Sequence, residues 1–355
     1  MGKKVKHFNV AFFIPHLGCP HNCSFCDQKS ISGKNEIVSL KDVEDGIISA
    51  LLDKKKAVKK GYKVILEICF FGGSFTAISE KQMDELLTIA SKYLKNENGK
   101  ITADGIRIST RPDYINEKIL LFLKKYGVTT IEIGCQSTND NILALNGRGH
   151  TFKAIQCACE LIKKHGFSLG CQMMAGLYGD TEESIIKTAN DIINQKPDTV
   201  RIYPVTVLKN TVLETLYKDK KYELISFNKM VDICATLLKM FYEKKINVIK
   251  LGLHSSKNVE KNFVAGYYHP AFREICESKI YEKLISEEII KNNIPKGFID
   301  VFVSKGEVSK VAGQKRANII FFEEKGYYIK IKEDILLNKY TIKIQKTERV
   351  EKICI

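Results

Sequence analysis

Alternation of strand-like and helix-like segments constrains the fold of this chain more than any other feature. Apolar runs of strand length are each followed by a turn and then by a segment with helical periodicity. The expected strands are 8–14, 64–71, 105–109, 129–135, 168–174 and 199–207. Six such units predict an α/β fold with a parallel sheet and right-handed crossovers. Since a closed barrel of this type has eight units, we predict an open three-quarter barrel, with a doubly wound sheet as the alternative.

Unusual motifs follow all six expected strands. They are a cysteine-containing loop, Gly72-Gly73-Ser74, Ser109-Thr110-Arg111, Gln136-Ser137, Ala175-Gly176 and Tyr203-Pro204. The carboxyl ends of parallel strands meet at one edge of a barrel, where binding sites gather. The sequence therefore predicts one pocket that all six motifs share.

The cysteine-containing loop follows the first expected strand. Cys19, Cys23 and Cys26 have a C-x3-C-x2-C spacing, and nearby prolines disfavour regular structure. A zinc site or an ordinary ferredoxin cluster normally needs four protein ligands. Three thiolates can hold a four-iron cluster and leave one iron open to a small molecule. The alternatives are a zinc site completed by His16 or His21, and three unrelated buried thiols.

The cysteine spacing resembles the signature of the radical S-adenosylmethionine (SAM) superfamily. This resemblance implies a partial (β/α)6 radical SAM barrel, with one [4Fe-4S] cluster on Cys19, Cys23 and Cys26 and with SAM on the open iron. It also implies an electron donor such as flavodoxin or ferredoxin, reductive cleavage of SAM and a 5′-deoxyadenosyl radical that abstracts hydrogen from the substrate. Cys157 and Cys159 are the only close pair elsewhere, so we expect one cluster.

Further motifs resemble the catalytic subunit of the elongator complex, whose members modify wobble uridines of tRNA. The resemblance covers roughly residues 8–225 and rests on segments 72–76, 108–114, 134–137, 148–151, 175–177 and 202–205. Two features depart from that family: its gap after the first cysteine is longer, and it carries a C-terminal acetyltransferase domain. After Cys276 we find no glycine-rich pyrophosphate loop. The chain most resembles short bacterial members without that domain.

The strand-end residues are our candidates for binding SAM. A glycine pair lets backbone approach the amino group of SAM, and Arg148 can hold its carboxylate unless it is merely a surface charge. Gln136 and Ser109 can hydrogen-bond ribose or carboxylate, and Phe25 can lie near the adenine. A more distant resemblance to the oxygen-independent coproporphyrinogen III dehydrogenase family adds Gln172 as a ribose contact. The full set is Phe25, Gly72, Gly73, Ser74, Ser109, Arg111, Gln136, Arg148 and Gln172.

Three residues are candidates for catalysis on the substrate. Tyr203 lies at the end of the sixth expected strand, and His254 ends an apolar run at 246–253. His269 follows an aromatic stretch. Each could be an acid, a base or a hydrogen relay, or could have only a structural role.

The last part of the chain has a different pattern. Residues 298–303, 317–322, 326–332 and 340–345 are expected strands with turns between them. We therefore expect three domains: the barrel at 1–245, a mixed helical extension at 246–295 and a small β-rich domain at 296–355.

Charge indicates the class of partner. The formal net charge is +15, which suits a polyanion such as RNA. No apolar run is long enough for a transmembrane helix, and the N-terminus has no signal-peptide pattern, so we expect a cytoplasmic protein. The leading function is radical SAM modification of a tRNA base. The alternatives are radical SAM chemistry on a small anionic metabolite or tetrapyrrole, and a non-catalytic iron–sulfur or zinc module that binds RNA.

Overall fold

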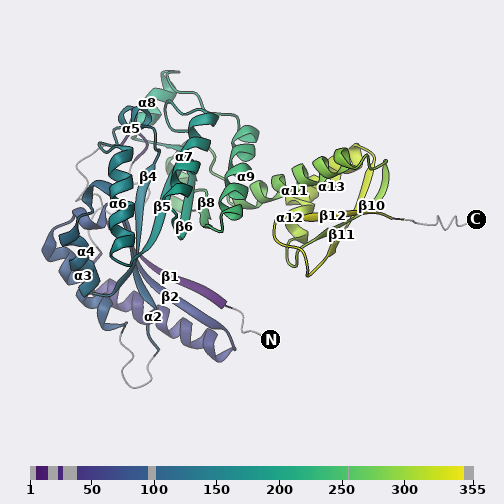
Figure 1. Ribbon diagram of the computed structural model, residues 1–355. Coiled ribbons are helices and arrows are strands. Elements are labelled where there is room, and N and C mark those ends of the chain that lie inside the picture. Colours follow the sequence, from purple (N-terminus) through teal and green to yellow (C-terminus); the bar gives the residue numbers. More distant parts are fainter. Residues whose placement is uncertain (1–4, 15–22, 27–37, 95–100, 255, 348–355) are drawn as a thin grey trace, which may run out of the picture. The chain divides into compact units, whose positions relative to one another are not determined.

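A computed structural model of the 355-residue chain describes residues 5–14, 23–26, 38–94, 101–254 and 256–347. The chain divides into two compact units (Figure 1). Unit 1 comprises residues 1–224 and 246–266, and unit 2 comprises residues 225–245 and 267–355. The domain boundaries expected at residues 245 and 295 stay a prediction. The two compact units meet at residues 224/225, 245/246 and 266/267.

Unit 1 is built on a seven-stranded parallel sheet in the order β1-β2-β3-β4-β5-β6-β8. The strands are β1 (Val5–Ile14), β2 (Lys63–Gly72), β3 (Gly105–Thr110), β4 (Val128–Gln136), β5 (Ser168–Ala175), β6 (Thr199–Pro204) and β8 (Asn247–Leu251). A doubly wound sheet reverses its strand order, and this sheet does not. The predicted open partial barrel is therefore confirmed.

The seventh strand corrects the expected count of six. The apolar run after residue 245 was expected to begin a helical extension, but β8 pairs in parallel with β6 and completes one edge of the sheet. Its side chains alternate less regularly than those of a solvent-facing strand, so periodicity alone could not assign it.

Helices connect the strands of unit 1. They are α2 (Leu40–Lys59), α3 (Glu80–Lys92), α4 (Glu117–Lys125), α5 (Asp140–Leu145), α6 (Phe152–Lys164), α7 (Glu182–Asn194), α8 (Val212–Lys218) and α10 (Lys257–Asn262). Helix α3 begins with a capping box, in which Ser79 and Gln82 exchange hydrogen bonds. A short antiparallel pair, β7 (Thr206–Leu208) and β9 (Phe263–Gly266), lies beyond the sheet.

Unit 2 combines helices with a three-stranded sheet. The helices are α9 (Phe227–Glu243), α11 (Phe272–Lys291), α12 (Val308–Ala312) and α13 (Ala317–Glu324), and the strands are β10 (Gly297–Val303), β11 (Tyr327–Glu333) and β12 (Ile342–Lys346). The strand order is β11-β10-β12, with β10 parallel to β11 and antiparallel to β12.

The expected strand at 317–322 was wrong, because this segment forms helix α13. A short apolar run does not by itself distinguish a buried helix from a strand. The buried amide of Asn318 donates to the carbonyls of Ser278 and Val311, at 2.9 and 3.0 Å, and these bonds hold the helical segment in the core of unit 2.

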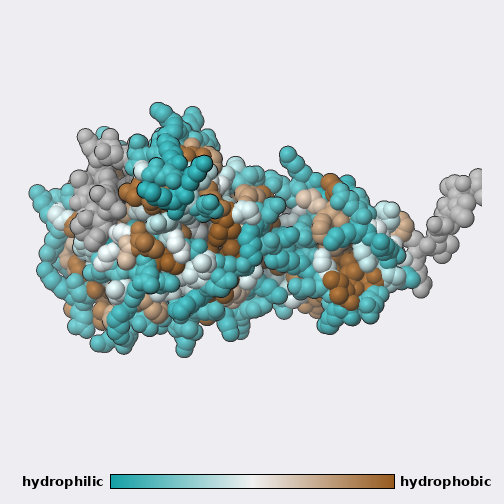
Figure 2. Space-filling view, turned by 90° about the horizontal axis from the view of Figure 1, so that it is seen from above, coloured by the Kyte–Doolittle hydropathy of each residue, from teal (hydrophilic) through white to brown (hydrophobic). Residues whose placement is uncertain are grey.

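The surface seen in Figure 2 is mostly hydrophilic, with hydrophobic residues gathered in smaller patches. Among the helices of the described ranges, none has the length and apolar composition that crossing a bilayer requires.

Candidate functional site

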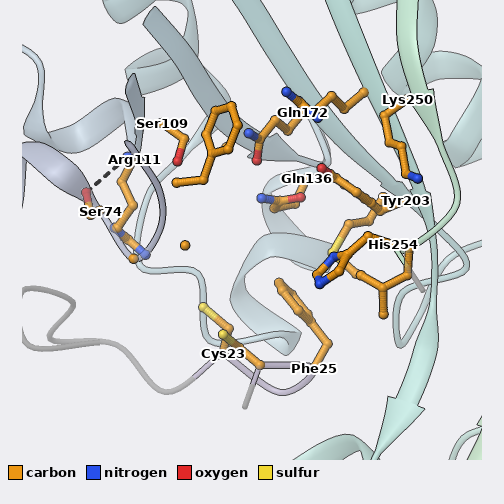
Figure 3. A pocket seen from close by; sticks show the side chains of 18 of the residues that line it. Cys23, Phe25, Ser74, Ser109, Arg111, Gln136, Gln172, Tyr203, Lys250 and His254 are labelled. Carbon is orange, nitrogen blue, oxygen red and sulfur yellow. Dashed lines mark hydrogen bonds between the residues drawn. The ribbon is translucent and has the colours of Figure 1, made fainter. Parts of the chain in front are cut away.

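A cavity of about 450 Å³ opens at the carboxyl ends of the unit 1 strands (Figure 3). Each of the seven strands contributes at least one residue to the lining of the cavity. Ala175 and Gly176 do not line the cavity, and their neighbour Met174 does. The structure thus brings five of the six predicted motifs to one pocket and adds Lys250 on β8, which the sequence did not single out.

The described part of the cysteine loop is a tight turn held by unit 1. The amide of Cys26 donates to the Cys23 carbonyl at 3.0 Å. Between them, Ser24 donates from its amide and its hydroxyl to Asn146, at 3.1 and 2.6 Å. Its carbonyl accepts from the Leu213 amide at 2.7 Å. These bonds present Cys23 and Cys26 at the cavity wall.

The third predicted ligand, Cys19, lies outside the described residues, as do His16 and His21. Within the ranges that the structure describes, no three His, Cys, Asp or Glu side chains are grouped as metal ligands. The cluster assignment of the three cysteines therefore stays a prediction.

Arg148 is buried against the cysteine turn. Its Nη1 donates to Cys23 Sγ at 3.3 Å, and its Nη2 donates to the Gly134 carbonyl at 2.8 Å. Its Nε is buried without a hydrogen-bond partner among the described residues. The surface-charge alternative for Arg148 is wrong, because only 6% of the residue is exposed.

Gln136 occupies a strained position beside Arg148. Its φ is 65°, in the left-handed region that non-glycine residues rarely adopt, and this distortion aims its side chain into the cavity. Its Oε1 is buried with no hydrogen-bond partner among the described residues. Gly134 makes room for this arrangement, since a Cβ there would lie 2.9 Å from Gln136 Nε2 and 3.3 Å from Arg148 Nη2.

Gly72, at the end of β2, and Gly73 line the cavity. Gly72 has a φ of 100°, and the Gly73 amide donates to the Ile14 carbonyl at 2.8 Å, which ties β1 to β2. Ser74 Oγ accepts from the Arg111 amide at 3.2 Å and shares a hydrogen bond of 2.7 Å with Thr110 Oγ1. Ser74 therefore also orients the end of β3.

Arg111 forms hydrogen bonds with other residues of the site. Its Nε and Nη2 donate to the carboxylate of Asp113 at 3.0 and 2.9 Å, and its Nη2 also donates to the Arg148 carbonyl. The end of β3 is thereby fixed to the loop that carries Arg148. We assign Arg111 a positioning role within the cavity wall.

A network of charged side chains lies deeper in the barrel. Both carboxylate oxygens of Glu132 accept from Arg201, at 2.6 and 3.0 Å. One of these oxygens also accepts from Arg107 at 2.9 Å, and the other from Gln172 at 2.9 Å. Burial alone would raise the pKa of Glu132, but Arg201 and Arg107 outweigh burial and hold that pKa below its usual range.

Gln172, the predicted ribose contact, is also part of this network. Gln172 lines the cavity, yet its amide group donates to Glu132. The sequence did not reveal this network, because its members lie far apart along the chain.

The predicted catalytic residues fall in two places. Tyr203 and His254 line the cavity, and the His254 ring stacks on Phe13 with centroids 5.9 Å apart. Burial, with the nearby charge of Lys250, lowers the pKa of His254, and burial raises the pKa of Tyr203. His269 belongs to unit 2 and does not line this cavity. Its Nδ1 accepts from the Ala271 amide at 3.0 Å, which agrees with the structural alternative.

Ser109 and Phe25 complete the predicted set. Ser109 is buried at the end of β3 and lines the cavity, whereas Phe25 is half-buried between the two described cysteines (Figure 3). The Phe25 ring packs against a cluster of buried apolar side chains that includes Ile142, Leu177 and Val205. That packing fixes Phe25 in the wall of the cavity.

Curated relatives include Elongator complex protein 3 of Danio rerio, 31% identical over 195 residues, which are 49% of this chain and 35% of that protein. The tRNA uridine(34) acetyltransferase of Methanocaldococcus infernus is 30% identical over 191 residues, 47% of this chain and 36% of that enzyme. An uncharacterized protein of Methanocaldococcus jannaschii is 27% identical over 244 residues, 66% of this chain and 72% of that protein. The chain thus spans about a third of the length of the elongator relatives it matches.

Among solved structures, the archaeal Methanocaldococcus infernus Elp3 with an N-terminal deletion superposes with a TM-score of 0.57. The match covers 82% of this chain and 65% of that one at 19% identity, so it supports the fold alone. Residues 197–282 match the radical SAM C-terminal domain. Residues 13–192 match the radical SAM superfamily, so the chain belongs to that superfamily of enzymes.

Proposed function

We propose that this protein binds one [4Fe-4S] cluster on Cys19, Cys23 and Cys26, binds SAM beside it, and modifies a base of tRNA. When bound, the cluster supplies the electron that cleaves SAM and generates a 5′-deoxyadenosyl radical. Flavodoxin or ferredoxin is the proposed electron donor, and the cytoplasm is the proposed location.

One observation carries the cofactor proposal. Two buried polar atoms at the cavity, Arg148 Nε and Gln136 Oε1, have no hydrogen-bond partner among the described residues. Leaving such groups unsatisfied costs roughly 1–3 kcal/mol each, and a ligand with matching donors and acceptors removes this cost. A carboxylate suits the arginine, and an amino or hydroxyl donor suits the glutamine oxygen. SAM carries all three groups.

The chain's own residues then have defined roles. Arg148 holds the carboxylate of SAM beside Cys23. Gly72 and Gly73 allow backbone to approach the amino group, and Gln136 and Ser109 contact the carboxylate or ribose. Phe25, held by its apolar neighbours, covers the adenine. Tyr203 and His254 lie at the same cavity and are the proposed substrate-facing groups.

Two observations support RNA as the substrate. The relatives matched over the radical SAM region include a tRNA uridine(34) acetyltransferase, and the chain carries a net charge of +15. Acetyl transfer is not part of this proposal, because the match covers only about a third of that enzyme.

The test is anaerobic reconstitution followed by an assay for 5′-deoxyadenosine with total tRNA. We expect product with the wild-type protein and none with Cys23→Ala or Cys26→Ala. Cys157→Ala is the matched control, because Cys157 is exposed on α6 and outside the cavity.

Each alternative function gives a different result. Product formation without salt-sensitive tRNA binding would favour a small anionic substrate. A protein that binds tRNA and leaves SAM intact would be a binding module.

A further inference from the structure

One face of the three-stranded sheet of unit 2 is covered by helices. Ile299, Val301 and Val303 on β10 are buried, at 0–1% exposure, on the side where α11, α12 and α13 pack against the sheet. Because side chains alternate along a strand, the intervening residues project to the opposite face. We call that opposite face the outer face of the sheet.

The outer face carries aromatic rings and lysines in register. Residues paired directly across neighbouring strands project to the same side. The rows across β11, β10 and β12 are Tyr328–Phe298, Lys330–Asp300–Gln345 and Lys332–Phe302–Lys343. Aromatic and basic side chains therefore alternate over one continuous surface.

The two rings of the first row are exposed side by side. Phe298 is 45% and Tyr328 is 48% exposed, and their ring centroids lie 5.0 Å apart with a tilt of 32°. Scattered apolar residues are normal on a surface, whereas adjacent exposed aromatic rings on one face of a sheet indicate a contact surface.

The charges on this face are complementary to phosphate. Lys330 and Lys343 are exposed. Asp300 is the only acidic residue in the three rows, and it is already paired with Lys332 at 2.8 Å. Lys332 also lies over the Phe302 ring, 5.5 Å from its centroid. The face is therefore positive around its rings, which suits a polyanion better than an apolar protein surface.

We propose that the outer face of this sheet binds a single-stranded segment of RNA. Bases stack on Phe298 and Tyr328, and phosphates contact Lys330 and Lys343. A paired duplex hides its base faces, so stacking of this kind selects unpaired nucleotides. The site lies outside both family matches, which cover residues 13–192 and 197–282, and it rests on the proposal that the substrate is RNA.

The experiment uses the full chain with its reconstituted cluster and a fluorescent single-stranded RNA of about 12 nucleotides, which is within the usual range of site sizes for such surfaces. Fluorescence anisotropy gives the Kd. In a Phe298→Ala/Tyr328→Ala variant we expect binding at least about tenfold weaker, since the bases no longer have rings on which to stack. The control is Ile335→Ala/Leu336→Ala, which removes two exposed apolar side chains outside the three rows and should leave the Kd unchanged.

A second variant tests the charges. Lys330→Gln/Lys343→Gln should weaken binding and reduce the slope of log K against log salt by about 1.4, or about 0.7 for each phosphate that is no longer neutralised. Lys244→Gln/Lys291→Gln removes two exposed lysines from other parts of unit 2 and should keep the wild-type slope.

Two controls, a variant that keeps both rings and a fully paired RNA, test whether base stacking explains the binding. A Phe298→Tyr/Tyr328→Phe variant keeps both rings and should bind like wild type, which separates stacking from folding. Unchanged affinity in the alanine variant, or equal affinity for a fully paired RNA, would overturn the proposal. Unchanged affinity in the alanine variant would favour a protein as the partner of the outer face.

The same samples separate this inference from the proposed chemistry. If 5′-deoxyadenosine never forms but the alanine variant binds RNA more weakly, the proposed reaction fails and the RNA surface stands. If 5′-deoxyadenosine forms and the alanine variant binds RNA normally, the reaction stands and the surface proposal fails.

Discussion

Strand β4 carries two polar residues with opposite surroundings. Glu132 lies in the middle of the strand, and both of its oxygens are satisfied by Arg107, Arg201 and Gln172. Gln136 lies at the strand's end, and its Oε1 has no partner among the described residues. Buried polar groups are normally hydrogen-bonded, so the satisfied group indicates a structural role and the unsatisfied group indicates a ligand site.

The largest effect should come from breaking the satisfied network. Glu132→Gln removes the counter-charge of Arg201 and leaves Arg107 only its pair with Glu67, so we expect the free energy of unfolding to fall by about 3–5 kcal/mol. Urea denaturation measures this change. The control is Glu85→Gln, which removes a longer, exposed pair with Lys81 and should cost no more than about 1 kcal/mol. Equal losses in both variants would contradict a structural role for the network.

Arg148→Met should act on binding more than on folding. Removing a charge-assisted hydrogen bond to the carboxylate costs roughly 1.5–3 kcal/mol, so we expect the Kd for SAM to rise by about ten- to a hundredfold. Isothermal titration of the reconstituted protein measures it. Arg148→Lys should not restore affinity, because an ammonium lacks the planar fork. Wild-type affinity for SAM in both variants would contradict the proposal that Arg148 binds the carboxylate.

His150 is buried two residues beyond Arg148 and should make the free energy of unfolding fall at acidic pH. Burial lowers its pKa from 6.5 to about 3, and the charges of Arg148 and Arg111 add to this effect. The unfolded chain therefore takes up a proton below pH 6.5 while the folded chain does so only near pH 3, so stability falls as the pH drops between these values. By about pH 5 the loss from His150 is about 2 kcal/mol.

Urea denaturation at about pH 7 and about pH 5 tests this expectation. His150→Phe should lose about 2 kcal/mol less than wild type between the two pH values. The exposed His7 provides the control, and His7→Gln should behave like wild type. Identical pH dependence in the His150→Phe variant would show that this imidazole does not titrate as expected.

Local patterns in the sequence predicted the parts of the site that depend on backbone geometry. Apolar runs fix the strands, and turn residues such as Gly72 mark where each strand ends, so the common position of the strand-end motifs follows from the topology of a parallel sheet. The sequence could not predict pairings across the barrel. Nothing near Glu132 indicates that Arg201, 69 residues away, is its partner.

The errors have a similar physical origin. Residues 317–322 carry enough apolar side chains for either a strand or a helix, and only tertiary contacts of Asn318 decide between them. Lys250 has no local signal, because its importance depends on neighbours from other strands.

The electron paramagnetic resonance spectrum of the reduced, reconstituted protein, recorded with and without SAM, tests the central claim most directly. Three thiolates that leave one iron open predict a [4Fe-4S] signal that changes when SAM binds in the wild-type protein. The Arg148→Met variant should show no change at the same SAM concentration. A signal that SAM leaves unaltered in the wild type, or a protein that holds zinc and no iron, would contradict the account.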